Sequence, residues 1–200
     1  MIAGLVLASG ASRRFGGNKL LASLGEHAVV HWAAAALSGT VDELLVVVAE
    51  DTDDMREALA GLPVRVVVND AADQGLSSSI RAGVSALPPE AEAVVITLGD
   101  QPLLERECVA RVIVRWQEGG VAAVATRYAD GRGHPVLFSS ALFPVLRRLE
   151  GDRGARAVLD GLGPAVALVE MEAEQPIDVD TREALEQVRS QLERRARDAR

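Results

Sequence analysis

The loop that follows the first apolar run of the chain combines groups that bind phosphate. Residues 2–8 are apolar, and segment 9–19 after them contains three glycines, two serines and the cations Arg13, Arg14 and Lys19. Glycine lets the backbone pass close to a ligand, where a Cβ would collide. Backbone amides, hydroxyls and positive charges together make a phosphate site. We therefore predict that segment 9–19 binds phosphate, and the alternative is a surface turn with incidental arginines.

Two common nucleotide-binding motifs do not describe this loop. A P-loop requires Ser or Thr after its lysine, whereas Leu20 follows Lys19 here. The dinucleotide fingerprint G-x-G-x-x-G requires two glycines two residues apart, whereas segment 9–12 contains only Gly10. The sequence therefore predicts neither a P-loop nor a dinucleotide site.

Carboxylates follow two later segments of the chain. Asp100 comes just after an apolar run at 94–98, and Asp178 and Asp180 lie two residues apart near the C-terminus. In an extended segment this spacing puts both side chains on one face. Mg²⁺ prefers one or two carboxylates together with phosphate oxygens and water. Asp100 and one residue of the pair are therefore candidate metal ligands, and the alternative is that all three cap helices.

Segment 69–79 supplies hydroxyl and amide groups after an apolar run at 64–68. Short polar side chains of this kind suit the edge of a base or a ribose, whereas serines at the start of a helix usually cap it. Spacing alone favours the capping interpretation. The residues concerned are Asn69, Gly75, Ser77, Ser78 and Ser79.

An alternation of strands and helices must position these segments. Apolar β-branched runs predict buried strands, and periodic segments that end at Gly or Pro predict helices, with Thr52 and Thr181 as N-caps. The predicted strands are 2–8, 44–49, 64–68, 94–98, 121–126, 136–138 and 166–170. The predicted helices are 27–37, 53–60, 76–87, 104–118, 142–149, 155–159 and 181–195, with a loop at 127–135 and a frayed or solvated tail at 193–200.

This alternation predicts a three-layer α/β fold with a mostly parallel, open sheet. Ligands of such folds bind beyond the carboxyl ends of the strands. Segments 9–19, 69–79 and 99–102 all follow predicted strands, so we expect them to meet at that edge.

Composition limits the class of protein. The chain has 200 residues, a formal net charge of -8 and 48% hydrophobic residues, which suits one domain with a sizeable core. The acidic balance argues against a nucleic-acid partner. The single cysteine, Cys108, excludes an internal disulfide and cysteine-based zinc sites. No apolar stretch reaches the length of a membrane span and no basic segment precedes the first apolar run, so we expect a cytoplasmic protein without a membrane partner.

The opening segment resembles the signature of a known family. Residues 7–19 read Leu-Ala-Ser-Gly-Ala-Ser-Arg-Arg-Phe-Gly-Gly-Asn-Lys, which is similar to L-A-A/G/S-G-x-S/T-x-R-F/M-G-x-x-K of the MobA-like nucleotidyltransferases. The resemblance implies the nucleotide-diphospho-sugar transferase (Rossmann-like) fold and a loop that wraps the triphosphate of a nucleoside triphosphate. It assigns nucleotide contacts to Leu7, Ala8, Ser9, Gly10 and Lys19, and catalytic roles to Arg14, Lys19 and Asp100.

Later segments extend this resemblance. Asp100 falls on the metal-binding aspartate of L/V-x-D-x-P, and Asp178 on the first acidic residue of D/N-I/V-D/N-T-x-E/D. The resemblance thus makes Asp100 and Asp178 ligands of Mg²⁺, or of Mn²⁺ in its place, and leaves Asp180 a structural role. Segment 75–81 is similar to G-L/M-S/G-x-S-L/I-x, the nucleobase loop of the cytidylyltransferase branch. It therefore extends the nucleotide contacts to Asn69, Gly75, Ser77, Ser78 and Ser79 and favours CTP over GTP.

Two further segments, 132–135 and 151–156, are similar to segments that the cofactor-handling branch uses for its acceptor. The resemblance makes His134 and Arg156 candidate contacts to an acceptor phosphate or pterin. The residues alone give neither segment a role, because a His before Pro is usually an ordinary loop residue. Residues 1–126 would form the nucleotide-binding half of one domain spanning 1–200, and residues 127–200 its acceptor-side half.

Taken together, the resemblance implies a Mg²⁺-dependent nucleotidyltransferase that transfers CMP from CTP to molybdopterin cofactor and releases pyrophosphate. The expected protein partner is a molybdoenzyme or its chaperone. The alternatives in this class are GMP transfer and nucleotidyl transfer to a sugar or polyol phosphate. The alternative from another class is a non-catalytic cofactor-binding or oxidoreductase-associated protein.

Overall fold

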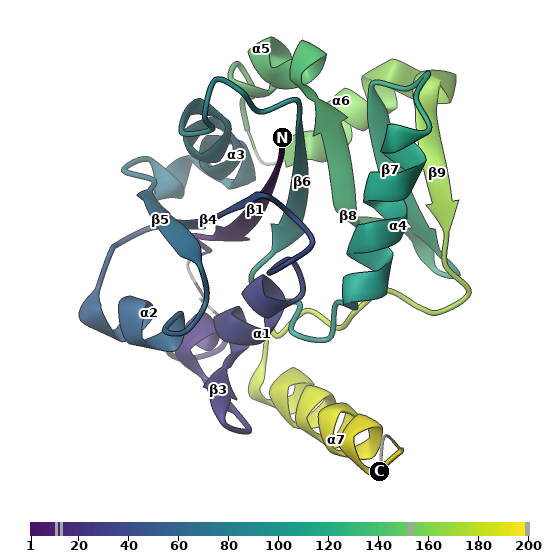
Figure 1. Cartoon of the computed structure of the whole chain (residues 1–200). Coiled ribbons are helices and arrows are strands. Elements are labelled where there is room, and N and C mark those ends of the chain that lie inside the picture. Colours follow the sequence, from purple (N-terminus) through teal and green to yellow (C-terminus); the bar gives the residue numbers. More distant parts are fainter. Residues whose placement is uncertain (11, 13, 152–153, 199–200) are drawn as a thin grey trace.

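Seven strands form one sheet through the middle of the molecule (Figure 1). The computed structural model describes residues 1–10, 12, 14–151 and 154–198. The strands are β1 (Ile2–Ala8), β4 (Glu43–Val48), β5 (Val64–Val68), β6 (Ala93–Leu98), β7 (Ala123–Tyr128), β8 (Gly131–Ser139) and β9 (Val166–Glu170). Their order is β5-β4-β1-β6-β8-β7-β9, and every neighbouring pair is parallel except the two that involve β8. The predicted mostly parallel, open sheet is confirmed.

Helices cover both faces of this sheet, which confirms the three layers. The α-helices are α1 (Val29–Ala35), α2 (Asp53–Ala58), α3 (Leu76–Ser85), α4 (Arg106–Gln117), α5 (Phe143–Leu146), α6 (Gly154–Leu162) and α7 (Arg182–Asp198). On one face α1, α2 and α4 pack against residues such as Val6 and Val95. On the other face α3, α5 and α6 pack against residues such as Leu5 and Ile96. Successive side chains of a strand point to opposite faces, so a strand covered on both sides is apolar throughout.

The loop predicted at 127–135 is wrong. The structure has a β-hairpin there, in which β7 extends to Tyr128 and β8 begins at Gly131. The pairing of β8 with its other neighbour, β6, reaches only from Ser139 to Val136. Residues 131–134 therefore extend past the part of β8 that pairs with β6, and their polar and glycine-rich composition hides the strand from a search for apolar runs.

The helix predicted to begin at residue 27 begins two residues later, at Val29. His27 and Ala28 instead form the short strand β3 (His27–Ala28), which pairs with β2 (Ser23–Leu24). This small hairpin follows the 3-10 turn η1 (Lys19–Leu21) directly. The phosphate loop predicted from the sequence is thus followed at once by ordered structure.

Thr52 and Thr181 cap helices as predicted. The amide of Met55 donates to Thr52 Oγ1, and the amide of Ala184 donates to Thr181 Oγ1, both at 3.2 Å. The second cap fixes the start of α7 immediately after the carboxylate segment 178–180.

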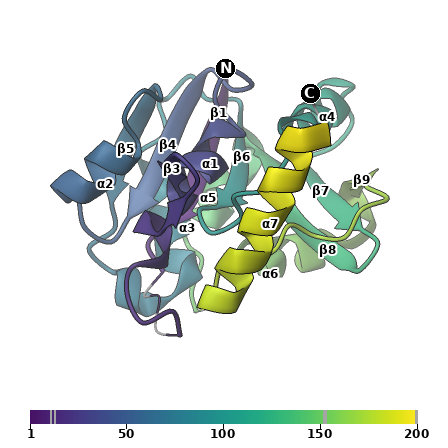
Figure 2. The ribbon, with the colours of Figure 1, turned by 90° about the horizontal axis from the view of Figure 1, so that it is seen from below.

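Helix α7 lies beyond the carboxyl ends of the strands rather than on a face of the sheet (Figures 1 and 2). It continues to Asp198, and residues 193–197 are exposed, so the described part of the tail is solvated, as one of the two predicted alternatives had it, and is not frayed. Leu185 and Val188 are buried in a cluster with Phe15 and Leu103. This packing holds the end of the chain against the loop after β1. Among the described residues, no helix has the length and apolar character needed to cross a membrane.

Candidate functional site

A cleft opens at the carboxyl ends of the central strands and brings together the three segments predicted to meet there. Its volume is about 530 Å³, which lies in the range of sites for small molecules. We call it the edge cleft. The residues that line it are Leu7, Ala8, Ser9, Gly10, Lys19, Leu20, Ala72, Asp73, Gly75, Leu76, Ser79, Leu98 and Asp100.

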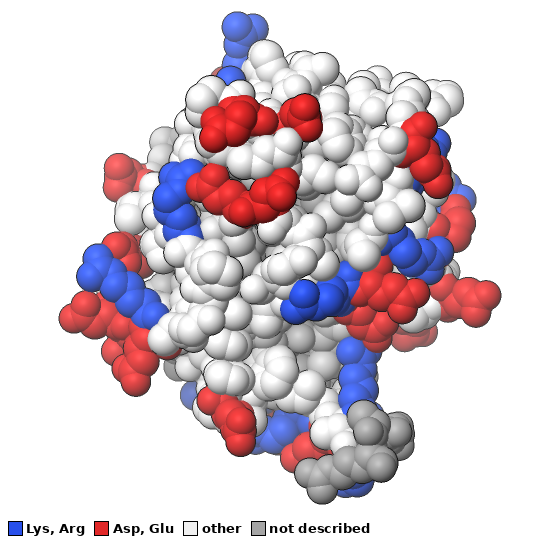
Figure 3. All heavy atoms as spheres, in the orientation of Figure 1, with Lys and Arg blue, Asp and Glu red and all other residues white. Residues whose placement is uncertain are grey.

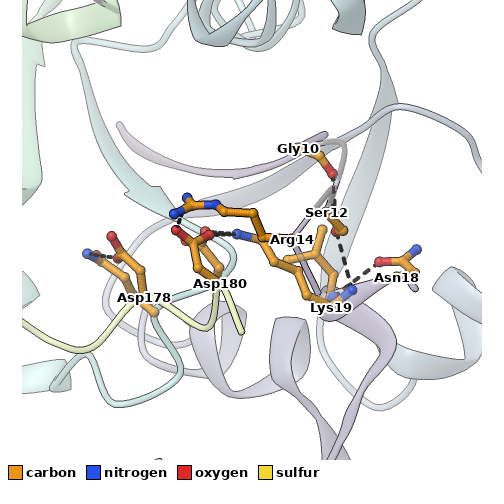
Figure 4. A network of polar contacts seen from close by, with 10 residues as sticks. Gly10, Ser12, Arg14, Asn18, Lys19, Asp178 and Asp180 are labelled. Carbon is orange, nitrogen blue, oxygen red and sulfur yellow. Dashed lines mark hydrogen bonds and ion pairs between the residues drawn. The ribbon is translucent and has the colours of Figure 1, made fainter. Parts of the chain in front are cut away.

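Lys19 connects two carboxylates beside the edge cleft. Its Nζ donates to Asp100 Oδ2 at 2.5 Å and to Asp180 Oδ1 at 2.7 Å. Arg14 pairs with the same Asp180 carboxylate, and the two cations approach it from the loop after β1 (Figure 4). The Lys19 side chain is only 9% exposed, so solvent screens its ion pairs weakly.

The charges in this cluster support one another. Burial acts against the charge on Lys19, but the hydrogen bonds to Asp100 and Asp180 and their negative charges outweigh it and raise the pKa of Lys19. The hydrogen bond from Lys19, with the positive charges of Lys19 and Arg14, lowers the pKa of Asp180. Lys19 and Asp180 are therefore both charged at neutral pH. Asp180 does not cap α7, because Thr181 does.

Asp178 lies on the other side of the same cluster. The amide of Val179 donates to the carbonyl oxygen of Asp100 at 2.9 Å, which ties segment 178–180 to the loop after β6. Val179, between Asp178 and Asp180, is fully buried. The carboxylates of these two residues point to the same side, as the i, i+2 spacing predicts (Figure 4). Burial, followed by the negative charge of Asp100, raises the pKa of Asp178. The carboxylates of Asp178 and Asp100 therefore lie close enough to repel each other.

Gly99 allows this arrangement of the strand ends. A Cβ at position 99 would lie 3.1 Å from the carbonyl oxygen of Leu7 and 3.0 Å from Ala8 Cβ. The amide of Gly99 donates to that same carbonyl oxygen at 2.9 Å. Glycine therefore lets β6 end directly against β1, which puts Asp100 beside the phosphate loop.

The described part of the phosphate loop is held by its own side chains. The amide of Lys19 donates to Ser12 Oγ at 3.3 Å, and the amide of Leu20 donates to Asn18 Oδ1 at 3.1 Å (Figure 4). Arg13, part of the predicted positive cluster, lies outside the described residues. The described cations of the loop, Arg14 and Lys19, both turn towards Asp180.

Of the three serines predicted to bind nucleotide at positions 77–79, only one lines the edge cleft. Ser79 does, and its Oγ lies 2.5 Å from Ser9 Oγ. Ser78 is buried and donates to the carbonyl oxygen of Gly75 at 2.7 Å. Ser77 is also buried, and its Oγ has no hydrogen-bond partner within the described structure. Helical geometry points consecutive residues in different directions, so the three side chains cannot share one environment.

Asn69 does not line the edge cleft but is buried behind the serines at the start of α3. It is 4% exposed, and its Nδ2 donates to Ser78 Oγ at 2.8 Å and to Ser79 Oγ at 3.2 Å. Its Oδ1 accepts a hydrogen bond from the amide of Ala71 at 3.1 Å. Asn69 thus fixes the start of α3 relative to the end of β5.

The two acceptor-side candidates are held differently. His134 is half-buried on β8, and burial lowers its pKa to about 4, although the negative charge of Asp100 acts in the opposite direction. Its imidazole is therefore neutral at pH 7. Arg156 is exposed in the first turn of α6 and forms no hydrogen bond or ion pair with any described residue. Asp152 and Arg153, from the same predicted segment, lie outside the described residues.

Three residues of the site have no role of this kind in the sequence prediction. Gln101 binds Asp178, Asp180 binds both loop cations, and Asp73 lines the edge cleft. The carboxylates carry the signal of residue type, because acids that follow strands at a ligand-binding edge are candidates. For Gln101, the only signal in the sequence was its position directly after Asp100.

The fold and the edge cleft define a class of protein. A mostly parallel sheet with a glycine-rich loop after its first strand, and with carboxylates at the same edge, is the architecture of α/β nucleotide-binding proteins. The family model of the MobA-like NTP transferase domain matches residues 4–168. The chain belongs to this family of nucleotidyltransferases, which confirms the resemblance of its opening segment.

Two relatives of known name cover more than nine-tenths of the chain, and a third covers about seven-tenths of it. The purine catabolism protein PucB of Bacillus subtilis is 32% identical over 200 residues, which cover 93% of this chain and 95% of that protein. The nicotine blue oxidoreductase of Paenarthrobacter nicotinovorans is 32% identical and covers 92% of this chain and 94% of that protein. A molybdenum cofactor guanylyltransferase of Cereibacter sphaeroides is 37% identical over 145 residues, which cover 71% of this chain and 68% of that protein.

Solved structures of similar proteins share the fold. Rv0371c of Mycobacterium tuberculosis has a TM-score of 0.83 and 30% identity, covering 94% of this chain and 97% of that one. Another crystal structure of that protein is a complex with manganese, with a TM-score of 0.75 and 30% identity over 94% of this chain and 98% of that one. A nucleotidyl transferase from Methanothermobacter thermautotroptrophicus has a TM-score of 0.80 and 26% identity, covering 97% of this chain and 98% of that one. The predicted nucleotide-diphospho-sugar transferase fold is confirmed.

Proposed function

We propose that this protein transfers CMP from CTP to molybdopterin cofactor and releases pyrophosphate. The observation that carries the proposal is the convergence of the loop after β1, Asp100 and segment 178–180 at the edge cleft and directly beside it, through Lys19 and the Val179 amide. Family membership supports the transferase activity. The name of a relative that acts on molybdenum cofactor supports the acceptor.

The loop after β1 binds the triphosphate in this proposal. Residues 7–10 contribute backbone and Ser9 hydroxyl groups to the edge cleft, and Lys19 and Arg14 contribute the positive charge. In the free protein both cations pair with carboxylates of the same chain. Nucleotide binding would transfer part of this pairing to phosphate oxygens, so the cations are kept in place before the ligand arrives.

Asp100 and Asp178 would hold a divalent cation together with the nucleotide. Oxygen ligands suit Mg²⁺ and Mn²⁺, and Mg²⁺ typically takes one or two carboxylates and fills its shell with phosphate oxygens and water. Within the described residues no group of three or more His, Cys, Asp or Glu is arranged for a metal ion, which agrees with a site completed by the substrate. The manganese complex of a relative supports a divalent cation as a partner of this protein. Such a cation would neutralise charge on the phosphates.

The reaction needs no covalent intermediate with the protein. An oxygen of the acceptor phosphate attacks the α-phosphorus, the bond from that phosphorus to the β-bridging oxygen breaks, and pyrophosphate leaves. The protein contributes position and charge: Lys19 and Arg14 stabilise the negative charge that develops on the leaving group. His134, neutral at pH 7, would hydrogen-bond the acceptor, and Arg156 would bind its phosphate.

GMP transfer from GTP is the second candidate. It is favoured by relatives that are named molybdenum cofactor guanylyltransferases, one of them 37% identical over 145 residues. The preference for CTP depends on segment 75–81, of which Gly75, Leu76 and Ser79 line the edge cleft. Two relatives that cover more of the chain have names that mention neither nucleotide. A third, 31% identical and covering 91% of the chain, is named a probable molybdenum cofactor guanylyltransferase.

Pyrophosphate release tests these proposals directly. The protein would be incubated with Mg²⁺ and molybdopterin cofactor, and with CTP, GTP or ATP in parallel. Release with CTP alone supports CMP transfer, and release with GTP alone overturns the nucleotide assignment while keeping the reaction. Binding of a nucleotide without release from any of the three would indicate a different acceptor or a non-catalytic protein.

A further inference from the structure

Gln101 connects the two segments that carry the candidate metal ligands. It follows Asp100 directly and is 3% exposed. Its Nε2 donates to Asp178 Oδ1 at 2.8 Å across 77 positions of sequence. A carboxylate oxygen only accepts, so the amide nitrogen, and not the amide oxygen, must face Asp178.

The other end of the same side chain is costly to the fold. Gln101 Oε1 is buried and accepts no hydrogen bond from any described residue. A buried acceptor without a protein donor usually destabilises the folded state, and an apolar residue of similar shape would avoid that cost. Ser77 Oγ and Thr97 Oγ1 are also unpaired, but neither side chain contacts a carboxylate of the site. A glutamine at position 101 is thus better explained by the hydrogen bond from its amide nitrogen to Asp178 than by a contribution to the stability of the fold.

Two contacts of different kinds hold Asp178. The hydrogen bond from the Val179 amide to the Asp100 carbonyl oxygen, at 2.9 Å, fixes the main chain of the segment. It leaves the Asp178 carboxylate free to rotate about its side-chain bonds. The hydrogen bond from Gln101 removes this freedom by fixing Oδ1, while no described residue donates to Oδ2.

We propose that Gln101 is a positioning residue that orients the Asp178 carboxylate, so that Oδ2 faces the divalent cation and the nucleotide. This inference rests on the proposed function, because it gives Asp178 the role of a metal ligand. Partners that orient metal-binding carboxylates typically change metal affinity about 10–100-fold when they are removed. Gln101 touches neither substrate nor reacting atoms in this proposal and acts through Asp178.

Binding of Mn²⁺ alone, measured by electron paramagnetic resonance on the full-length protein, tests the inference without turnover. Gln101→Met removes the donor and keeps the length of the side chain, and we expect it to weaken Mn²⁺ binding about tenfold. Its thermal unfolding midpoint should equal or exceed that of the wild type, because the unpaired Oε1 is removed as well. Thr97→Val is the matched control: it also removes an unpaired buried oxygen, and it should leave Mn²⁺ binding unchanged.

Asp178→Asn separates this inference from the proposed function. If Asp178→Asn weakens Mn²⁺ binding and Gln101→Met does not, Asp178 remains a ligand and the positioning role is overturned. If neither variant changes Mn²⁺ binding, the metal role of Asp178 fails, and the inference fails with it. Should Gln101→Met not fold, Gln101→Asn serves instead, because it keeps the polar group but shortens its reach. The same loss of Mn²⁺ affinity is then expected.

Discussion

The residues proposed for the nucleotide side of the site and those proposed for its acceptor side differ in how the protein holds them. On the nucleotide side, Lys19 and Asp100 are joined by an ion pair across 81 positions of sequence, and Ser9 and Ser79 by a hydrogen bond across 70. On the acceptor side, His134 has a half-buried neutral ring, and Arg156 is exposed without a partner among the described residues. The first set is fixed before any ligand binds, whereas Arg156 is free to adapt to one.

This difference predicts which residues contribute to the rate of the reaction and which contribute to acceptor binding. Groups that must stabilise charge in a transition state act best when their geometry is set in advance. A group that only captures one end of an acceptor can be ordered on binding, at a cost in affinity rather than in rate. We therefore expect changes on the nucleotide side to lower kcat, and changes at Arg156 to act mainly through KM.

The largest effect is expected from Asp100→Asn. The change removes one proposed metal ligand and the ion pair with Lys19 while keeping the size of the side chain. We expect kcat for pyrophosphate release to fall about 10³-fold, since preorganised charge stabilisation is worth roughly 3–4 kcal/mol per group. Asp51→Asn removes a carboxylate that pairs with Arg56 away from the edge cleft and should leave kcat unchanged. A fall of less than tenfold for Asp100→Asn would place Asp100 outside the reacting centre.

Lys19→Met should lower kcat and, at the same time, raise the affinity of the nucleotide-free protein for Mn²⁺. Loss of the cation should lower kcat about 10²-fold through weaker stabilisation of the triphosphate. Asp100 and Asp180 would then face each other without their shared partner, so Mn²⁺ should bind the nucleotide-free variant more tightly than the wild type. Titration of both proteins with Mn²⁺ measures this, and Lys19→Arg, which keeps the charge, is the control. Equal Mn²⁺ affinities would show that Lys19 and the cation do not compete for Asp100.

Most of the fold follows from patterns that are visible in the sequence. Strands such as β1 and β6 are buried on both faces, so each is an almost continuous apolar run, with Thr97 as the one hydroxyl residue of β6. The first part of β8 is different. Residues 131–133 pair with β7 but extend beyond the part of β8 that pairs with β6, so their composition of glycine and arginine resembles that of a loop. These residues form a strand because they pair with β7. Pairing of this kind leaves no signal in the local sequence.

Residue type predicted the members of the site better than their arrangement. A lysine, an aspartate and several serines that follow strands predicted the edge of the sheet at which the structure brings these residues together. Which serine lines the cleft depends on the rotation of α3, which puts Ser79 into it and Ser77 into the core. The contact from Gln101 to Asp178 depends on how segment 178–180 is registered along the loop after β6. Both features are properties of packing between distant segments, and neither is encoded in a short motif.

His134 should make the stability of the protein depend on pH. Its pKa is about 4 in the folded protein, against about 6.5 in an unfolded chain, so between these values the unfolded state binds more protons. Stability is therefore complete above about pH 6.5 and is lost as the pH falls towards 4, by roughly 2 kcal/mol at pH 5. Urea unfolding at pH 7 and pH 5 measures this, with His134→Gln as the comparison. The same pH dependence in His134→Gln would mean that His134 is not the group responsible.

The smallest effect, and the most direct test of the comparison, is expected from Arg156→Gln. Arg156 forms no ion pair with a described residue, so its loss should leave folding stability and the KM for CTP unchanged. A charge-assisted contact to an acceptor phosphate is worth about 1.5–3 kcal/mol, so the KM for the acceptor should rise about tenfold or more. Arg115→Gln changes an arginine that pairs with Glu118 at the end of α4, and it controls for the loss of one positive charge. If Arg156→Gln instead lowers kcat with an unchanged acceptor KM, Arg156 acts in the transition state. The acceptor side would then be as much a part of the reacting centre as the nucleotide side, in spite of its exposure.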